Sequence, residues 1–173
     1  MMTRRNIYLV GPMGSGKSTI GRQLAAGLGW EFLDSDKEIE GRTGVDIPLI
    51  FELEGEAGFR KREKAVIEDF TALNGVVLAT GGGAILDPDN RKALASNGLV
   101  IYLSAPIDQL VARTSKDRNR PLLQNTDPRV RLEEIMSVRE PLYREVADWV
   151  LDTGGRNVRA VVKDILQRLD EEQ

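Results

Sequence analysis

The chain has 173 residues, a length that suits one domain with its own buried core. Hydrophobic residues make up 41% and charged residues 29%, and the formal net charge of -3 argues against a general nucleic-acid binder. The sequence has no cysteine and no histidine, which excludes disulfides, thiolate metal sites, a cysteine nucleophile and a hydrolase of the Ser-His-Asp type.

Short apolar runs alternate with amphipathic stretches along the chain, a pattern that predicts an α/β domain with a mostly parallel sheet. None of the runs is long enough to cross a bilayer, and the run behind the basic amino end is too short for a signal peptide. We therefore expect a cytoplasmic protein that does not enter a membrane. The predicted strands are residues 7–10, 31–34, 76–79, 99–103 and 149–152.

Directly after the first predicted strand, residues 11–18 match the phosphate-binding pattern G-x-x-x-x-G-K-[ST] at every specified position. The glycines allow a turn whose N–H groups face phosphate oxygens, and a helix beginning near Lys17 adds the positive end of its dipole. Lys17 can reach the β- and γ-phosphates, and the Ser18 hydroxyl can ligate Mg²⁺. A glycine turn that binds nothing is the alternative, but the strand–loop–helix context favours a nucleotide site.

Two acids follow the second predicted strand. Asp34 is placed to hold magnesium through water, because open α/β sheets bind ligands beyond the carboxyl ends of their strands. Asp36 could accept a hydrogen bond from a substrate hydroxyl and orient it for attack. The competing interpretation is structural: Ser35 and Glu38 form a capping-box pattern, and acids stabilise the first turn of a helix.

Further along, residues 55–73 carry apolar side chains at helical spacing, with Arg60 either binding a ligand or lying on a solvated face. Thr80-Gly81-Gly82-Gly83 follows the third strand, and its glycines form either a tight turn or a wall that a small ligand can approach closely. Asp87-Pro88 and Asp127-Pro128 each predict a helix start.

Two more arginine positions stand out. The polar segment 115–121 predicts a surface loop or a mobile lid, with Arg120 as the lid arginine and Arg113, Lys116 and Arg118 as competitors. Arg139 falls on the apolar stripe of residues 127–146, so it needs an anion, either a ligand or an internal salt-bridge partner. Pro141 could kink this helix and change the direction in which Arg139 faces.

Taken together, the phosphate loop, Asp34-Ser35-Asp36, Gly58-Phe59-Arg60 with Glu63, Thr80 to Gly83, Arg120-Pro121-Leu122-Leu123, and Arg139 with Pro141-Leu142-Tyr143 resemble the shikimate kinase family over nearly the whole chain. The resemblance implies a P-loop fold of the nucleoside monophosphate kinase type, a three-layer α/β/α domain with a five-stranded parallel sheet. It also implies transfer of a phosphoryl group from MgATP to the 3-hydroxyl of shikimate.

The resemblance implies one kinase domain over residues 1–173, with a phosphate loop at 11–19, a substrate-binding region at about 34–62 and a lid at about 114–125. Lys17, Asp36 and Arg120 are the implied catalytic residues, and Ser18 and Asp34 the implied metal site. Implied nucleotide contacts are Gly14, Ser15, Gly16, Lys17, Ser18, Thr19, Arg120 and Arg156; implied shikimate contacts are Asp36, Arg60, Gly81, Gly82, Gly83 and Arg139.

Other readings of the phosphate loop remain. A related kinase acting on gluconate or a nucleoside monophosphate would share the loop and the lid. A regulatory GTPase would carry an Asn-Lys-x-Asp segment, which the sequence lacks. We expect small-molecule partners, shikimate and ATP, no nucleic acid or membrane partner, and a monomer.

Overall fold

A parallel sheet of five strands organises the computed structural model, which describes residues 6–114 and 127–172. The strands are β1 (Ile7–Val10), β2 (Glu31–Asp34), β3 (Val76–Ala79), β4 (Leu99–Ser104) and β5 (Trp149–Asp152), in the order β2-β3-β1-β4-β5. All five predicted strands are confirmed, and β4 extends one residue further than predicted. The central strands are buried along their length, whereas the edge strands β2 and β5 are partly exposed.

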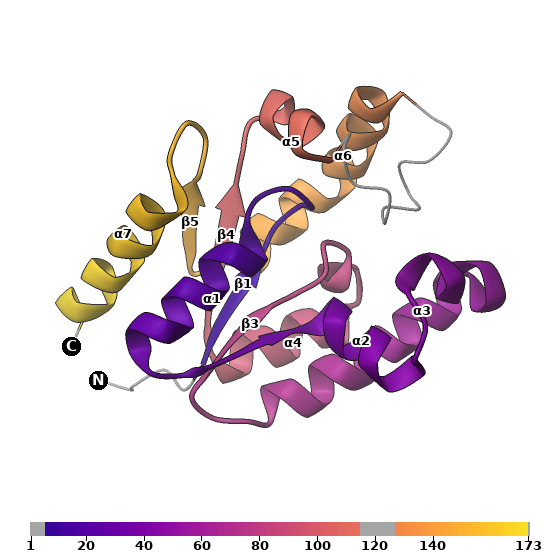
Figure 1. Cartoon of the computed structure of the whole chain (residues 1–173), viewed down its shortest axis with the longest axis horizontal. Helices are drawn as coiled ribbons and strands as arrows, with labels where there is room; N and C mark the ends of the chain where they lie inside the picture. The colour runs from indigo at the N-terminus through magenta and orange to yellow at the C-terminus, as the bar shows by residue number, and fades with distance from the viewer. Residues whose placement is uncertain (1–5, 115–126, 173) are drawn as a thin grey trace.

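Helices cover both faces of this sheet (Figure 1), which confirms the predicted three-layer α/β/α architecture. The helices of one face are α1 (Lys17–Leu28) and α7 (Val158–Glu171). Those of the other face are α2 (Ser35–Thr43), α3 (Ile47–Thr71), α4 (Pro88–Asn97) and α6 (Pro128–Val146). A short helix α5 (Ile107–Thr114) and a 3-10 turn η1 (Ala84–Leu86) complete the elements.

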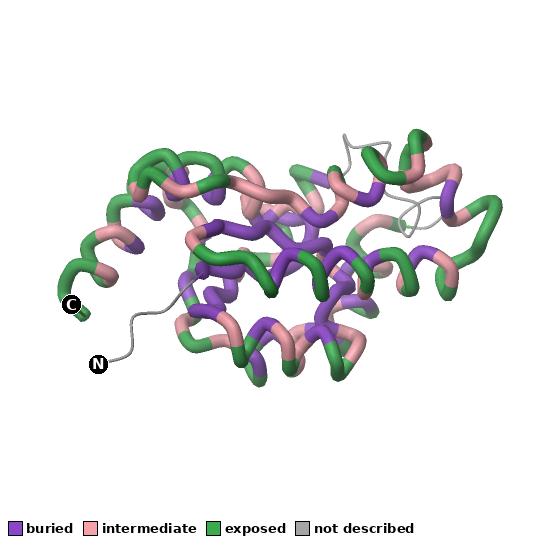
Figure 2. The backbone as a smooth tube through the Cα atoms, turned by 90° about the horizontal axis from the view of Figure 1, so that it is seen from below, coloured by how far each residue is buried: buried purple, intermediate pink, exposed green. Residues whose placement is uncertain are grey.

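Side chains of β1 alternate between two apolar cores. Ile7 and Leu9 pack under α1 and α7, while Tyr8 and Val10 pack under the helices of the opposite face. Figure 2 shows the buried residues concentrated in the sheet, with exposed residues on the outer sides of the helices. No helix within the described residues is both long enough and apolar enough to span a membrane.

The register of the sheet brings three strand ends to one level. Asp34 at the end of β2 pairs with Ala79 at the end of β3, and Ala79 pairs in turn with Leu9 of β1. The segments that leave these strands therefore emerge side by side at the carboxyl edge of the sheet, where parallel α/β proteins bind ligands.

Three helix starts agree with the prediction and two differ. Helix α1 begins at Lys17, as expected. Asp87 and Asp127 cap α4 and α6 by accepting from the N–H groups of Asp89 and Arg129. The predicted helix at 55–73 is in fact α3, which starts at Ile47 and has a non-helical residue, Gly55 (φ 73°, ψ 178°), where the prediction placed its beginning.

Helix α2 provides the other correction. Asp34, and not Ser35, is its cap, because the Asp34 carboxylate accepts from the N–H groups of Asp36 and Lys37. The Ser35–Glu38 capping box predicted from the sequence is therefore wrong.

Candidate active site

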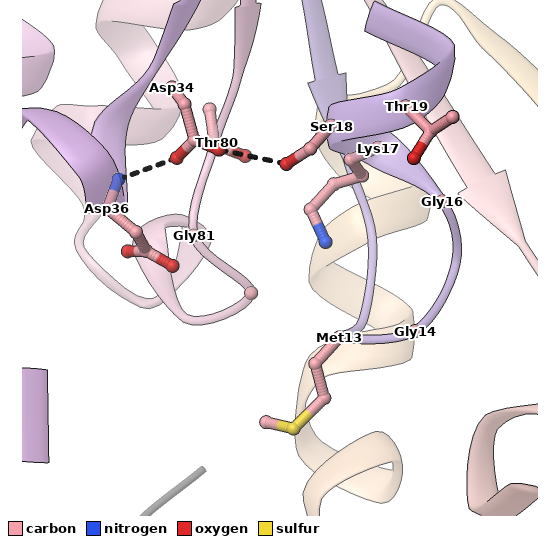
Figure 3. A pocket seen from close by; sticks show the side chains of 11 residues that line it. Met13, Gly14, Gly16, Lys17, Ser18, Thr19, Asp34, Asp36, Thr80 and Gly81 are labelled. Atoms are coloured by element: carbon pink, nitrogen blue, oxygen red, sulfur yellow. Dashed lines mark hydrogen bonds between the residues drawn. The ribbon is translucent and has the colours of Figure 1, made fainter. Parts of the chain in front are cut away.

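A pocket lies at the carboxyl edge of the sheet, between the phosphate loop, the start of α2 and the turn after β3 (Figure 3). Figure 3 shows the Lys17 and Asp36 side chains projecting into the same space from α1 and α2. The residues that line this pocket are Met13, Gly14, Gly16, Lys17, Ser18, Thr19, Asp34, Asp36, Thr80, Gly81 and Gly82.

The phosphate loop adopts a conformation that depends on glycine. Gly14 and Gly16 have φ values of 84° and 94°, a region that other residues seldom occupy. Lys17 Nζ donates to the carbonyl oxygens of Gly11 and Pro12 at 2.8 and 2.9 Å, so its charge lies over the loop. Because α1 begins at Lys17, the N–H groups of its first turn point at the same space, which suits an anion.

Asp34 joins the phosphate loop to α2. Ser18 Oγ donates to Asp34 Oδ2 at 2.8 Å, while Oδ1 of the same carboxylate caps α2. The functional and structural readings of Asp34 are thus both compatible with its contacts. A hydroxyl and a carboxylate beside a phosphate-binding loop are the oxygen donors that Mg²⁺ takes, so this pair fits the predicted metal.

The triple glycine after β3 leaves room for three functional side chains. A Cβ on Gly81 would lie 2.6 Å from Asp36 Oδ1, and one on Gly83 would lie 2.4 Å from Arg60 Nη2. A Cβ on Gly82 would lie 3.4 Å from Arg139 Nη1. Gly83 has φ of -98°, so space and not backbone conformation requires glycine there. The turn therefore gathers Asp36, Arg60 and Arg139 against one wall.

Arg60 is held by a buried acid on its own helix. Its Nη1 donates to Glu63 Oε1 at 2.9 Å, and the Glu63 side chain is 1% exposed. Burial raises the pKa of the Glu63 carboxyl to about 7, against the opposing effect of the Arg60 charge. Glu63 Oε2 has no hydrogen-bond partner among the described residues and lies 3.0 Å from the position of a Cβ on Gly81, beside Asp36.

Arg139 faces inward, as its place on the apolar stripe predicts. Only 5% of it is exposed, and α6 continues through Pro141 without turning it outward. Burial lowers the pKa of Arg139, and the nearby Arg60 charge lowers it further, while Tyr143 acts in the opposite direction. A guanidinium group buried beside the Arg60 charge favours an anion in the adjoining space, which suits a ligand carboxylate.

The remaining predicted residues are placed differently. Arg120 and most of the predicted lid lie outside the described residues. Arg113 contacts the phosphate loop, donating to the Gly14 carbonyl at 2.8 Å. Arg156 lies against the first turns of α7, where it contacts Asp164 at 3.4 Å and the Ala160 carbonyl at 3.3 Å.

Glu63, Ser35 and Tyr143 are site residues to which the sequence analysis assigned no role in binding or catalysis. Glu63 carried a detectable signal, because it falls on the apolar stripe of α3 with Phe59 and Val66, where an acid needs a partner. Ser35 Oγ accepts from the Gly81 N–H at 2.9 Å, a contact between segments 46 residues apart that no local pattern indicates.

Comparisons with known proteins agree on one family. A family model for shikimate kinase matches residues 13–170. A shikimate kinase from Methylococcus capsulatus is 57% identical over 171 residues, covering 99% of this chain and 96% of the relative. A solved structure of a shikimate kinase from Acinetobacter baumannii in complex with shikimate is 50% identical with a TM-score of 0.96, covering 99% of this chain and 96% of that one.

A gluconokinase from Sinorhizobium meliloti is a more distant match. It has a TM-score of 0.65 at 17% identity and covers 99% of this chain and 94% of its own. At that identity the match indicates a shared fold alone.

Proposed function

This chain belongs to the shikimate kinase family, and from that premise we propose that it transfers the γ-phosphoryl group of ATP to the 3-hydroxyl of shikimate, giving shikimate 3-phosphate and ADP. The observation that carries this proposal is the arrangement of Asp36, Arg60 and Arg139 against one glycine wall, beside a phosphate loop. Shikimate is a carboxylate with several hydroxyls, so two guanidinium groups and an acceptor carboxylate complement it. The reaction serves the route to chorismate and the aromatic amino acids.

At the phosphate end, the loop amides and the first turn of α1 bind the triphosphate. Lys17 exchanges its bonds to the Gly11 and Pro12 carbonyls for phosphate oxygens and stabilises the charge that develops during transfer. Ser18 and Asp34, which contact each other at 2.8 Å, would hold Mg²⁺. The ion, when bound, neutralises charge on the phosphate oxygens.

At the acceptor end, Arg60 and Arg139 bind the shikimate carboxylate and so fix the orientation of the ring. Asp36 accepts a hydrogen bond from the attacking hydroxyl and aims it at the γ-phosphorus. Glu63 keeps Arg60 in place through its 2.9 Å contact. Phosphoryl transfer through a loose transition state needs positioning more than base strength, which is what these contacts supply.

Other parts of the proposal rest on family resemblance. Arg120 belongs to a lid over ATP at about 114–125, and Arg156 contacts the adenine. The chain is a single kinase domain and acts as a monomer in the cytoplasm.

An acceptor panel tests the function. We expect kcat/KM to be higher for shikimate than for gluconate or AMP in a coupled ADP-release assay, and Arg139→Ala to raise the KM for shikimate by roughly 30-fold or more, because it removes one partner of a charged contact in a dry site. The KM for ATP should stay unchanged. Arg144→Ala is the matched control, because Arg144 lies on the same helix with its side chain 57% exposed. A preference for gluconate or AMP would refute the proposal.

A further inference from the structure

Tyr143 connects α6 to the glycine wall. It is fully buried, and its hydroxyl donates to the Gly82 carbonyl at 2.6 Å, across 61 residues of sequence. Burial raises the pKa of Tyr143, so the hydroxyl remains a donor throughout the working range of the enzyme.

Of the three glycine carbonyls, only that of Gly82 has its hydrogen-bond donor outside the local turn, and that donor is Tyr143. The Gly81 and Gly83 carbonyls accept from the N–H groups of Ala84 and Leu86, each at 3.1 Å, within the η1 turn. The middle carbonyl, that of Gly82, accepts from Tyr143 instead. Tyr143 of α6 therefore helps to fix the orientation of the peptide that carries the Gly82 carbonyl.

The Tyr143 ring is itself firmly placed. It stacks on Tyr102 of β4 with ring centroids 5.0 Å apart and an interplanar angle of 27°. Tyr102 is buried in the same core, and its hydroxyl donates to Glu140. Packing of its ring against Tyr102 thus holds the Tyr143 hydroxyl beside the Gly82 carbonyl.

Arg139 lies one helical turn before Tyr143 on α6, so the two side chains project from the same face. The same helix thus carries a guanidinium group of the acceptor site and the hydroxyl that fixes the opposite wall, and Gly82 is the glycine nearest Arg139. We propose that Tyr143 is a positioning residue, whose bond to Gly82 sets the gap between the glycine wall and Arg139 in which the acceptor binds. This inference rests on the proposed function.

Tyr143→Phe tests the inference, with Tyr102→Phe as the matched control in the stacked neighbour. Tyr143→Phe leaves the Gly82 carbonyl without its partner and also removes the interaction of the Tyr143 hydroxyl with Arg139, so both sides of the gap lose a support. We expect the KM for shikimate to rise roughly tenfold, the effect of one lost hydrogen bond, with the KM for ATP unchanged. Tyr102→Phe should leave both KM values unchanged, and the two variants should melt at similar temperatures.

A double-mutant cycle sharpens the test. If Tyr143 acts by setting the gap to Arg139, adding Tyr143→Phe to Arg139→Ala should change the KM for shikimate by less than about twofold. Additive losses, equal losses for ATP and shikimate, an unchanged KM for shikimate or a collapsed fold in Tyr143→Phe alone would each overturn the inference. A wild-type chain that does not phosphorylate shikimate would instead refute the proposed function and, with it, this inference.

Discussion

At the scale of single residues, the glycines after β3 matter because they have no side chain. The atoms that a Cβ would strike at Gly81 and Gly83 belong to Asp36, Glu63 and Arg60. These are ends of side chains that can move at small cost to the fold, but they are also the groups that the proposed mechanism uses.

Gly83→Ala should therefore impair function more than stability. The new methyl group displaces the Arg60 guanidinium from the acceptor site, and we expect the KM for shikimate to rise by roughly tenfold or more, as for loss of a charged hydrogen bond. Gly41→Ala is the control, because nothing lies within 4 Å of the added Cβ in α2. Steady-state kinetics and urea unfolding measure the two effects. A fully active Gly83→Ala enzyme would contradict the steric argument.

Glu63 gives a pH dependence whose sign follows from its pKa, which burial raises from the ordinary 4.5 of a glutamate to about 7. Between these values the folded chain keeps a proton that the unfolded chain has released, so stability falls as pH rises through this window. Wild type should therefore lose about 2 kcal/mol relative to Glu63→Gln between about pH 5 and about pH 7.5.

Urea unfolding of both chains at the two pH values measures this difference. Glu56→Gln is the matched control, because Glu56 contacts the same Arg60 at 3.4 Å from an exposed position. A pH slope that is the same in wild type and Glu63→Gln would rule out a proton on Glu63.

At the scale of elements, α3 shows where local patterns succeed and where they fail. The apolar spacing of residues 55–73 predicted the longer part of the helix correctly, although α3 ends at Thr71. The first part of α3, residues 47–54, was missed. Gly55 separates it from the longer part, with φ and ψ angles that glycine adopts and other residues seldom do. Arg62 joins the two parts, donating to both carboxylate oxygens of Glu54 at 2.7 Å.

Gly55→Ala should destabilise the chain by about 1–3 kcal/mol, because an alanine at φ 73° and ψ 178° is strained. Gly41→Ala again serves as the control: Gly41 lies within helix α2, where alanine is expected to stabilise by about 0.5–1 kcal/mol. The midpoint of urea unfolding reports both changes. Equal midpoints for the two variants would show that residue 55 can relax without strain.

At the scale of the whole molecule, the sequence predicted the helices and strands better than the contacts between them. The central strands β1, β3 and β4 were predictable because parallel strands with both faces covered form continuous apolar runs. The phosphate loop was predictable because its chemistry is contained in eight consecutive residues. The contacts of Ser35 with Gly81 and of Tyr143 with Gly82 were not, because they join segments 46 and 61 residues apart and depend on strand order and register.

The glycines after β3 also limit which substitutions could make this enzyme resistant to an inhibitor. Every amino-acid replacement of a glycine adds at least one carbon atom, so any other residue at 81 or 83 would crowd Asp36, Glu63 or Arg60. A compound that packs against this surface would consequently meet a target in which substitution at 81 or 83 also weakens binding of the acceptor.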